Sequence, residues 1–252
     1  PEPFDKVLKT AQDLGFAEAD PTFDIEGFDA GHKIALLSMI AYNKSVDFSS
    51  ISIEGITKID AIDISFAKDM GYIIKLLGIS KEIDGTLDIR VHPTMLPEKH
   101  PLAAVNDEFN AVMFDGDMTD PILLYGKGAG SYPTASAVVS DIVDIAIKES
   151  IEEQSITLLE KSEYVTPNDR ISRYYIRIYT DDKSGILSKI SGVLGDHNIS
   201  ISSVMQKESD SEYIPLIIMT HEAKEDSIND SIKEINNFDF IRQDVMVIRV
   251  ED

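Results

Sequence analysis

Cysteine is absent from this chain of 252 residues. Its absence excludes disulfides, thiolate metal ligands and cysteine nucleophiles. Long apolar runs are missing as well, because no run approaches the roughly 18 residues that a membrane-spanning helix needs. The first residues also lack the basic and apolar stretches of a secretion signal. We therefore expect a soluble protein of the cytoplasm that has no membrane partner.

Basic residues are scarce. The chain has 23 Lys plus Arg against 45 Asp plus Glu, which gives a formal net charge of −22, and both halves are acidic. Nucleic-acid binding depends on Lys and Arg that neutralise phosphates, so we expect no nucleic-acid partner. The apolar content of 43% is ordinary for a globular core.

Several common site patterns are also missing. The five histidines include no pair three or four residues apart, which excludes a zinc-binding helix motif. The sequence contains no Asp-x-Asp-x-Asp-Gly calcium loop, no Gly-x-Ser-x-Gly elbow and no Walker A sequence. We expect no metal site.

Hydrophobic periodicity predicts an α+β fold, with helices and a mixed or antiparallel sheet in the first part of the chain. Asp-Gly pairs at 84–85 and 115–116 predict turns between strands. The helices expected from apolar spacing cover residues 4–14, 29–43, near 59–70 and roughly 133–149. The strands expected from period-two spacing cover residues 86–91, 110–114 and 121–125, and they follow an apolar run at 72–77.

A second unit follows a stretch rich in Glu, Ser and Thr. Its elements are predicted in the order strand, helix, strand, strand, helix, strand over about eighty residues, which is the split βαβ pattern of ferredoxin-like domains. We therefore divide the chain into a first domain at 1–150, a linker at 151–172 and a second domain at 173–252.

The segment 18–33 is the most suggestive part of the sequence. It is acidic and rich in turn residues, and it brings Asp29 and Lys33 four positions apart on one helix face. One interpretation is a solvated loop with a weak ion pair. The other is a site in which carboxylates hold a substrate ammonium and a lysine moves a proton. Spacing alone does not choose between them.

A glycine-rich loop, Gly126-Lys-Gly-Ala-Gly130, precedes the helix at 133–149. Helix N-terminal amides attract anions, so the loop superficially matches a phosphate-binding turn. No acidic residue follows at the position that a Rossmann unit requires. Composition alone favours a tight turn.

Residues 18–33, Glu-Ala-Asp-Pro-Thr-Phe-Asp-Ile-Glu-Gly-Phe-Asp-Ala-Gly-His-Lys, resemble the substrate-site signature of homoserine dehydrogenases. The loop and helix start at 126–137 resemble that family's late glycine loop. Residues 173–250 resemble an ACT domain, the amino-acid-sensing module at the C-terminus of many members. The resemblance covers nearly the whole chain and corresponds to the C-terminal portion of such an enzyme.

The resemblance implies an oxidoreductase of threonine and methionine biosynthesis, which interconverts L-aspartate 4-semialdehyde and L-homoserine with NAD or NADP. It implies that Lys33 is the general acid/base and that Asp24 is a further catalytic carboxylate. Glu18 and Asp29 match carboxylates that bind the amino-acid substrate. Gly130 matches a glycine whose backbone meets the cofactor.

The sequence departs from that family at its start. The Gly-x-Gly-x-x-Gly of the N-terminal Rossmann domain and a second catalytic lysine are absent. A dinucleotide needs that scaffold, so we expect the 252-residue chain alone neither to bind NADP(H) tightly nor to turn over. The resemblance also implies a homodimer or higher homo-oligomer.

The ACT-like part carries Asp181-Asp-Lys-Ser-Gly185, with Ser184 where this family commonly has proline. Gly185 allows the tight turn into the following helix, and Asn198 closes that helix. The resemblance places both beside an effector pocket, with L-threonine as the expected effector. The alternative function is a non-catalytic amino-acid-binding or dimerisation module that only retains the scaffold.

Overall fold

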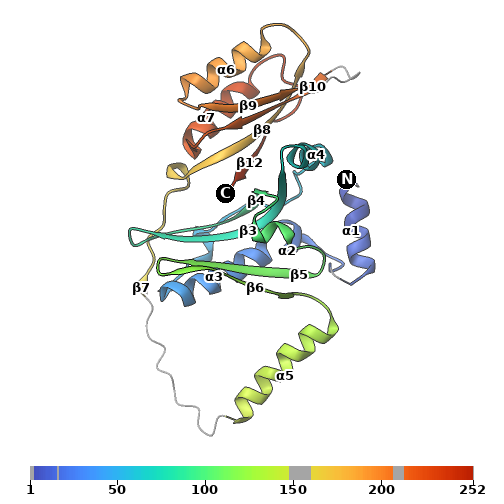
Figure 1. Ribbon diagram of the computed structural model, residues 1–252, viewed down its shortest axis with the longest axis vertical. Helices are drawn as coiled ribbons and strands as arrows, with labels where there is room; N and C mark the ends of the chain where they lie inside the picture. Colours follow the sequence, from blue (N-terminus) through green and yellow to red (C-terminus); the bar gives the residue numbers. More distant parts are fainter. Residues whose placement is uncertain (1–2, 16, 148–159, 207–212, 252) are drawn as a thin grey trace.

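The computed structural model describes residues 3–15, 17–147, 160–206 and 213–251. Its fold is α+β, as hydrophobic periodicity predicted. The molecule is elongated, with the C-terminal unit at one end and helix α5 (Ser131–Ile147) projecting at the other (Figure 1). Within the described ranges, no helix combines the length and apolar character needed to cross a membrane.

The helices expected in the first part of the chain form within a few residues of their predicted bounds, although residues 148–149 lie outside the described ranges. The short elements α2, β1, η1 and η2 were not expected. The elements of this part are α1 (Phe4–Asp13), α2 (Thr22–Ile25), α3 (Phe28–Tyr42), β1 (Lys44–Ser45), η1 (Phe48–Ser50), β2 (Ser52–Ile53), α4 (Ala61–Asp69), β3 (Tyr72–Ile83), β4 (Thr86–Pro97), η2 (Pro101–Ala104), β5 (Phe109–Gly116), β6 (Thr119–Lys127) and α5.

The C-terminal unit has the predicted βαββαβ order, with one additional two-residue strand. Its elements, with the short ones that precede it, are β7 (Glu160–Lys161), η3 (Pro167–Asp169), β8 (Ile171–Asp181), α6 (Ile186–Asp196), β9 (Ile201–Gln206), β10 (Tyr213–Thr220), β11 (Ala223–Lys224), α7 (Glu225–Asn236) and β12 (Met246–Val250).

One eight-stranded mixed sheet runs through both parts of the molecule. Its order is β2-β4-β12-β8-β10-β9, with β3 added on β4 and β11 on β8. The joint is made by β12, which pairs in parallel with β4 and antiparallel with β8. The two parts are therefore connected by backbone hydrogen bonds as well as by the chain.

The turn between β3 and β4 follows the Asp-Gly prediction. Asp84 and Gly85 both have positive φ, 50° and 83°, as the favoured two-residue hairpin turns require. The hairpin pairs from Ile83 with Thr86 to Tyr72 with Pro97. Strands β5 and β6 form a second hairpin, in a sheet of their own.

Helix α3 packs on one face of the β3–β4 hairpin. Its Ser38 hydroxyl donates to the Ser80 hydroxyl at 2.7 Å, and the Tyr42 hydroxyl donates to the Ser80 carbonyl at 3.1 Å. Gly78 lets the helix approach, because a Cβ there would lie 3.1 Å from the Ile34 Cβ. These contacts fix the helix whose first turn carries the predicted substrate site.

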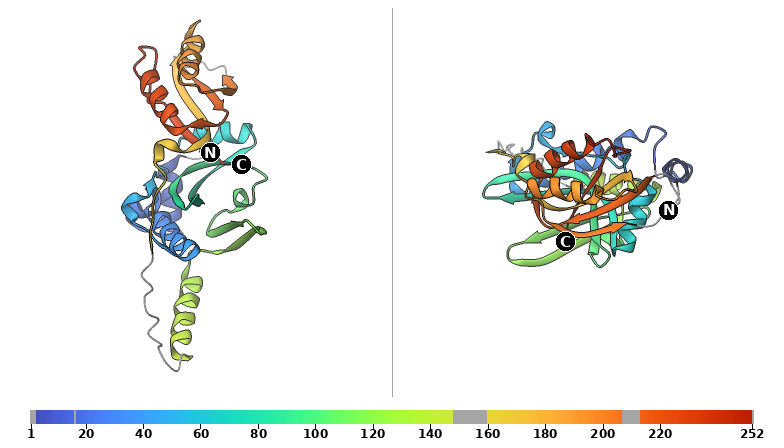
Figure 2. Two further views of the ribbon diagram at one scale, coloured as in Figure 1. Left: turned by 90° about the vertical axis from the view of Figure 1, so that its left-hand side faces the viewer. Right: turned by 90° about the horizontal axis from the view of Figure 1, so that it is seen from above.

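The C-terminal unit buries both faces of its strands. Helices α6 and α7 cover one face over a core that includes Tyr174, Ile176 and Leu194. Helix α4 of the first part covers the other face, where Phe66 packs with Tyr175. The second unit is therefore packed against the first and not merely tethered to it, as the left view of Figure 2 also shows.

The described half of the predicted linker is in contact with the first part. Strand β7 pairs in parallel with β1, and Leu87 forms an isolated bridge with Tyr164. The Tyr164 hydroxyl accepts from the Asp47 backbone N–H at 2.7 Å. Residues 151–159 of the predicted linker lie outside the described ranges.

Candidate functional site

The acidic segment leads into α3 through Gly27, at a position that residues other than glycine do not fit easily. Gly27 caps the helix with φ 81°, and a Cβ there would lie 3.1 Å from Val91 Cγ1 and 3.4 Å from Ile53 Cγ2. Positive φ and close packing both favour glycine. Gly27 thus holds the end of the acidic loop against β2 and β4 at the start of α3.

Asp29 on the first turn of α3 meets Lys33, which lies one turn further along the helix. The Lys33 Nζ donates to Asp29 Oδ2 at 2.6 Å, and the two side chains are 63% and 45% exposed, respectively. A carboxylate in a first helical turn is favoured by the helix dipole. Because both groups remain accessible, the pair presents a negative and a positive group to solvent.

Glu18 and Asp24 are also exposed, and Asp24 lies on α2. Helix α2 packs beside α3. In the described part of the chain, no hydrogen bond or ion pair joins the side chain of either residue to Lys33. The structure therefore brings together Asp29 and Lys33 and leaves the other two predicted carboxylates exposed on the preceding loop.

A ring stack that the sequence did not reveal lies beside this pair. His32 stacks on Phe48 with ring centroids 4.1 Å apart and an interplanar angle of 6°, and Phe23 lies 6.0 Å away on the other side. The rings come from α3, η1 and α2. The stack packs these three elements together, and His32 at the position before Lys33 was a local signal that could have indicated it.

Gly130 lies at the start of α5, with φ 112°. Its carbonyl accepts hydrogen bonds from the Thr134 backbone N–H at 3.2 Å and hydroxyl at 3.0 Å. An open hollow beside it is lined by Ser131, Tyr132 and Lys127, and the Lys127 Nζ pairs with Glu108 at 2.8 Å. Free helix amides and a nearby lysine suit a phosphate-bearing group.

The apolar side chains of α5 are exposed, for example Ile142 at 60%. Figures 1 and 2 show the helix extending away from the hairpin β5–β6.

Among the described residues, no group of three or more His, Asp or Glu side chains is arranged to hold a metal ion.

Gly185 and Asn198 lie at opposite ends of α6. Gly185 caps its start with φ 90°, and Asn198 follows its end with φ 59°. A hollow at the start of α6 is lined by residues 180–187 together with Gln206, Ile214 and Leu216. Gly185 therefore borders this hollow, and Asn198 does not line it within the same chain.

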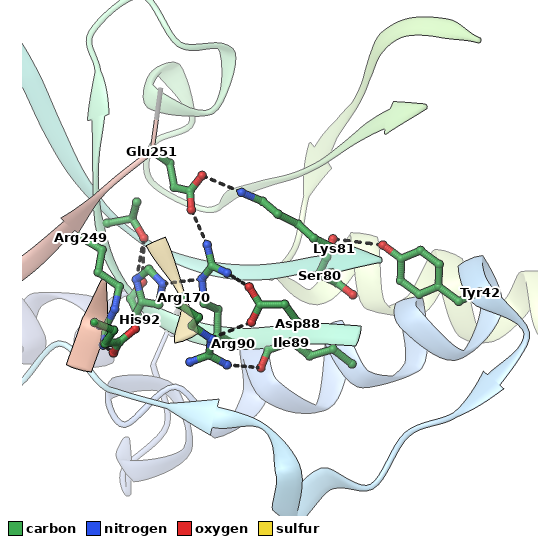
Figure 3. Close-up of polar contacts among 12 residues, drawn as sticks. Tyr42, Ser80, Lys81, Asp88, Ile89, Arg90, His92, Arg170, Arg249 and Glu251 are labelled. Carbon is green, nitrogen blue, oxygen red and sulfur yellow. Dashed lines mark hydrogen bonds and ion pairs between the residues drawn. The ribbon is translucent and has the colours of Figure 1, made fainter. Parts of the chain in front are cut away.

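Sequence reasoning missed a buried ion cluster where the two parts join (Figure 3). Arg90 bonds Asp88 and Glu251, and Arg170 donates to Asp88 at 2.7 Å. Lys81 extends the cluster to the surface through Glu251 at 3.0 Å. Because Arg170 precedes β8 and Glu251 follows β12, the cluster connects the C-terminal unit to β4.

His92 lies inside this cluster and is neutral. Burial, followed by the positive charge of Arg249, lowers the pKa of His92 to about 3. Its Nε2 accepts from the Arg90 Nε at 3.1 Å, so its Nδ1 carries the proton and faces the Pro93 carbonyl at 3.0 Å. The neutral ring serves as an acceptor that an imidazolium could not replace.

A second buried ion pair joins α4 to β8. Asp63 accepts from the Arg177 Nε at 2.7 Å and Nη2 at 3.0 Å, and from the Tyr175 hydroxyl at 2.9 Å. It also closes the capping box of α4 with Asp60. Burial, followed by the charge of Asp63 and its hydrogen bond, raises the pKa of Tyr175 above its ordinary value.

Together these features define a class. It is an α+β protein in which an exposed acidic segment leads into a helix that carries Lys33, and this part shares a sheet and buried ion pairs with a C-terminal βαββαβ unit. A family model described as homoserine dehydrogenase matches residues 1–143, and the ACT domain model matches residues 174–240. The chain belongs to the homoserine dehydrogenase family and carries an ACT domain.

Individual relatives agree with this assignment. The chain is 42% identical over 257 residues to a homoserine dehydrogenase of Neisseria gonorrhoeae, covering 98% of this chain and 59% of the relative. It is 37% identical to the homoserine dehydrogenase of Bacillus subtilis, and the match covers 99% of this chain and 59% of that relative. A solved homoserine dehydrogenase from Thiobacillus denitrificans superposes with a TM-score of 0.89 at 40% identity, with 99% and 58% covered. The chain thus spans about 59% of the length of these curated relatives.

Proposed function

We propose that this chain forms the substrate-binding and regulatory part of an L-homoserine dehydrogenase, which interconverts L-aspartate 4-semialdehyde and L-homoserine with NAD or NADP. The observation that carries the proposal is the pair of Asp29 and Lys33 on the first two turns of α3, joined at 2.6 Å and open to solute. The names of the relatives support the activity, and the acidic loop offers the chemistry that an amino-acid substrate needs.

The roles of the side chains follow from the reaction. Both substrates carry an α-ammonium group, for which Glu18 and Asp29 are suitable partners. Reduction of the aldehyde delivers a hydride to carbon and a proton to oxygen. The Lys33 ammonium donates that proton and takes it back in the reverse direction, from within about 2.6–3.2 Å of the oxygen. Asp24 is assigned as a further catalytic carboxylate of the same loop.

The nicotinamide cofactor, when bound, supplies or accepts the hydride. The hollow beside Gly130 fits a part of it, because the start of α5 offers backbone amides to an anion, while Glu108 in the same lining pairs with Lys127. A full dinucleotide site needs a Rossmann scaffold, and these 252 residues contain no Gly-x-Gly-x-x-Gly sequence. We therefore propose that the chain alone neither binds NADP(H) tightly nor turns over.

The ACT domain is assigned a regulatory role with L-threonine as its effector. The hollow at the start of α6 contains Gly185, whose backbone is open to an amino acid, and Asp181, whose carboxylate is paired with Arg242 and Lys183. Asn198, at the far end of α6, is assigned to the same site across a pair of ACT domains. This assignment requires a homodimer or higher homo-oligomer, and we place the enzyme in the cytoplasm.

The binding experiment uses amide NMR spectra of the 252-residue chain titrated with millimolar L-homoserine. We expect shifts at residues 24–33, and about tenfold weaker binding in Asp29→Asn, because a charge-assisted hydrogen bond is lost. Asp230→Asn removes an exposed carboxylate on α7 that also pairs with a lysine, and it should leave the affinity unchanged.

L-Threonine serves as the second ligand in the same spectra. It should shift residues 181–187 and respond equally in the wild type and in Asp29→Asn. Two results would contradict the assignment of the acidic loop and favour the non-catalytic amino-acid-binding module. One is homoserine shifts confined to residues 181–187, and the other is equal homoserine affinity in the wild type and Asp29→Asn.

A further inference from the structure

Arg249 on β12 stands between the two parts of the molecule. Its Nη2 donates to Glu54 at 2.9 Å and also bonds Glu225 in the first turn of α7. Its side chain is 11% exposed. Burial alone would lower the pKa of Arg249, but the hydrogen bonds of Glu225 and Glu54 outweigh it and raise the pKa. One buried cation therefore holds a carboxylate from each part.

Residues 54–56, which follow β2, pack directly against the acidic loop. The Glu54 backbone N–H donates to the Val91 carbonyl at 2.8 Å, and the Ile56 N–H donates to the Ile25 carbonyl at 2.8 Å. Gly55 lies so close to the loop that a Cβ there would collide with the Ile25 carbonyl and the Glu26 Cα. The position of residues 54–56 thus sets the position of residues 25–26.

The same support continues into the first turns of α3. The Ile53 side chain lies against Gly27 and Gly31, where a Cβ would come within 3.4 and 2.7 Å of its methyl groups. Asp29 and Lys33 are on that helix. A shift of residues 53–56 therefore displaces the loop and the helix that together carry the predicted substrate groups.

We propose that Glu54 is a positioning residue for the acidic loop, and that its ion pair with Arg249 makes the geometry of that loop depend on the ACT domain. The proposal rests on the proposed function for its catalytic meaning. The ACT domain holds Arg249 in place through β12 and Glu225. Glu54 is the carboxylate of the first part that pairs with Arg249. A shift of α7 or β12 moves Arg249. Through Glu54, it also moves residues 53–56, which contact the acidic loop.

The test is amide hydrogen exchange of the 252-residue chain. Glu54→Ala removes the half-exposed carboxylate, which is 48% exposed, and leaves Arg249 paired with Glu225. We expect exchange of the amides at 25–31 and 56 to rise about two- to fivefold, the range for one partly exposed ion pair. Glu54→Gln keeps an acceptor for Arg249 and should fall between the wild type and Glu54→Ala.

Asp169→Ala is the matched control, because it breaks the exposed pair that joins Asp169 of η3 to Lys224 of β11 at 3.7 Å. Its exchange at 25–31 should equal that of the wild type. Exchange in Glu54→Ala that equals this control would overturn the proposal. So would an equal rise at the buried amides of β8, since that result indicates global destabilisation.

Homoserine titration of the same variants separates this inference from the proposed function. Glu54→Ala should weaken homoserine binding about two- to fivefold while its amide shifts stay at residues 24–33. If homoserine fails to bind the wild type, the proposed function fails, and the exchange data alone decide whether Glu54 positions the loop.

Discussion

At the scale of single residues, the structure shows how a strand of alternating polar residues becomes a buried one. Asp88, Arg90, His92 and Thr94 alternate along β4 and are all less than 5% exposed. Each is satisfied by a neighbour, and His92 remains neutral among arginines. Buried charges persist only when they are paired and hydrogen-bonded. Such a cluster makes stability depend on pH.

The pH dependence of unfolding tests His92. Its pKa is about 3 in the folded chain and about 6.5 unfolded, so the unfolded state binds more protons between these values. The stability it contributes is present above pH 6.5 and is lost as the pH falls towards 3. Urea unfolding should show a loss from His92 that approaches about 1.4 kcal/mol per pH unit between pH 6 and 5.

His92→Gln is the comparison for that measurement, because its amide oxygen can accept from Arg90 and does not titrate. Its stability should fall less steeply over the same pH range. All other ionisable groups are common to both proteins and cancel in the difference. Identical slopes would show that His92 is protonated in the folded chain, contrary to the account.

At the scale of elements, the local sequence predicts well where local chemistry decides. The Asp-Gly pair at 84–85 predicted the β3–β4 turn, and apolar spacing predicted α3 and α6, with glycine or asparagine in left-handed positions at their ends. The local sequence did not predict that α4 covers one face of the strands of the C-terminal unit. That contact depends on Asp63 meeting Arg177, and two residues so far apart in the chain leave no periodic signal.

Asp63→Ala tests how much this pair contributes to holding α4 on β8. The change leaves the buried Arg177 guanidinium and the Tyr175 hydroxyl without their partner. Removing one partner of a buried ion pair costs about 3–5 kcal/mol. The free energy of unfolding in urea should fall by this amount.

The control for Asp63→Ala is Asp230→Ala, which removes an exposed carboxylate that pairs with Lys233 on the same helix. It should change stability little, because exposed ion pairs contribute little. A loss in Asp63→Ala no larger than that of the control would mean that α4 is held by its apolar contacts alone.

At the scale of the whole molecule, the main surprise is that two predicted domains share one sheet. Each unit was recognisable from its own pattern, but the parallel pairing of β12 with β4, with Arg249 opposite Thr94, joins residues that no local window contains. For the site, spacing alone supplied only the pair of Asp29 and Lys33. Glu18, Asp24 and Gly130 came from resemblance, and the Glu54–Arg249 contact required the fold.

Lys33 is proposed to carry the proton in a homoserine dehydrogenase reaction. The most direct measurement replaces the matching region of the Thiobacillus denitrificans enzyme, of which this chain covers 58% at a TM-score of 0.89, with this chain, and follows homoserine-dependent reduction of NAD or NADP. We predict turnover in the chimera and a fall of about 10²–10⁴-fold in Lys33→Ala, with an unchanged melting temperature. Full turnover in Lys33→Ala would contradict the account.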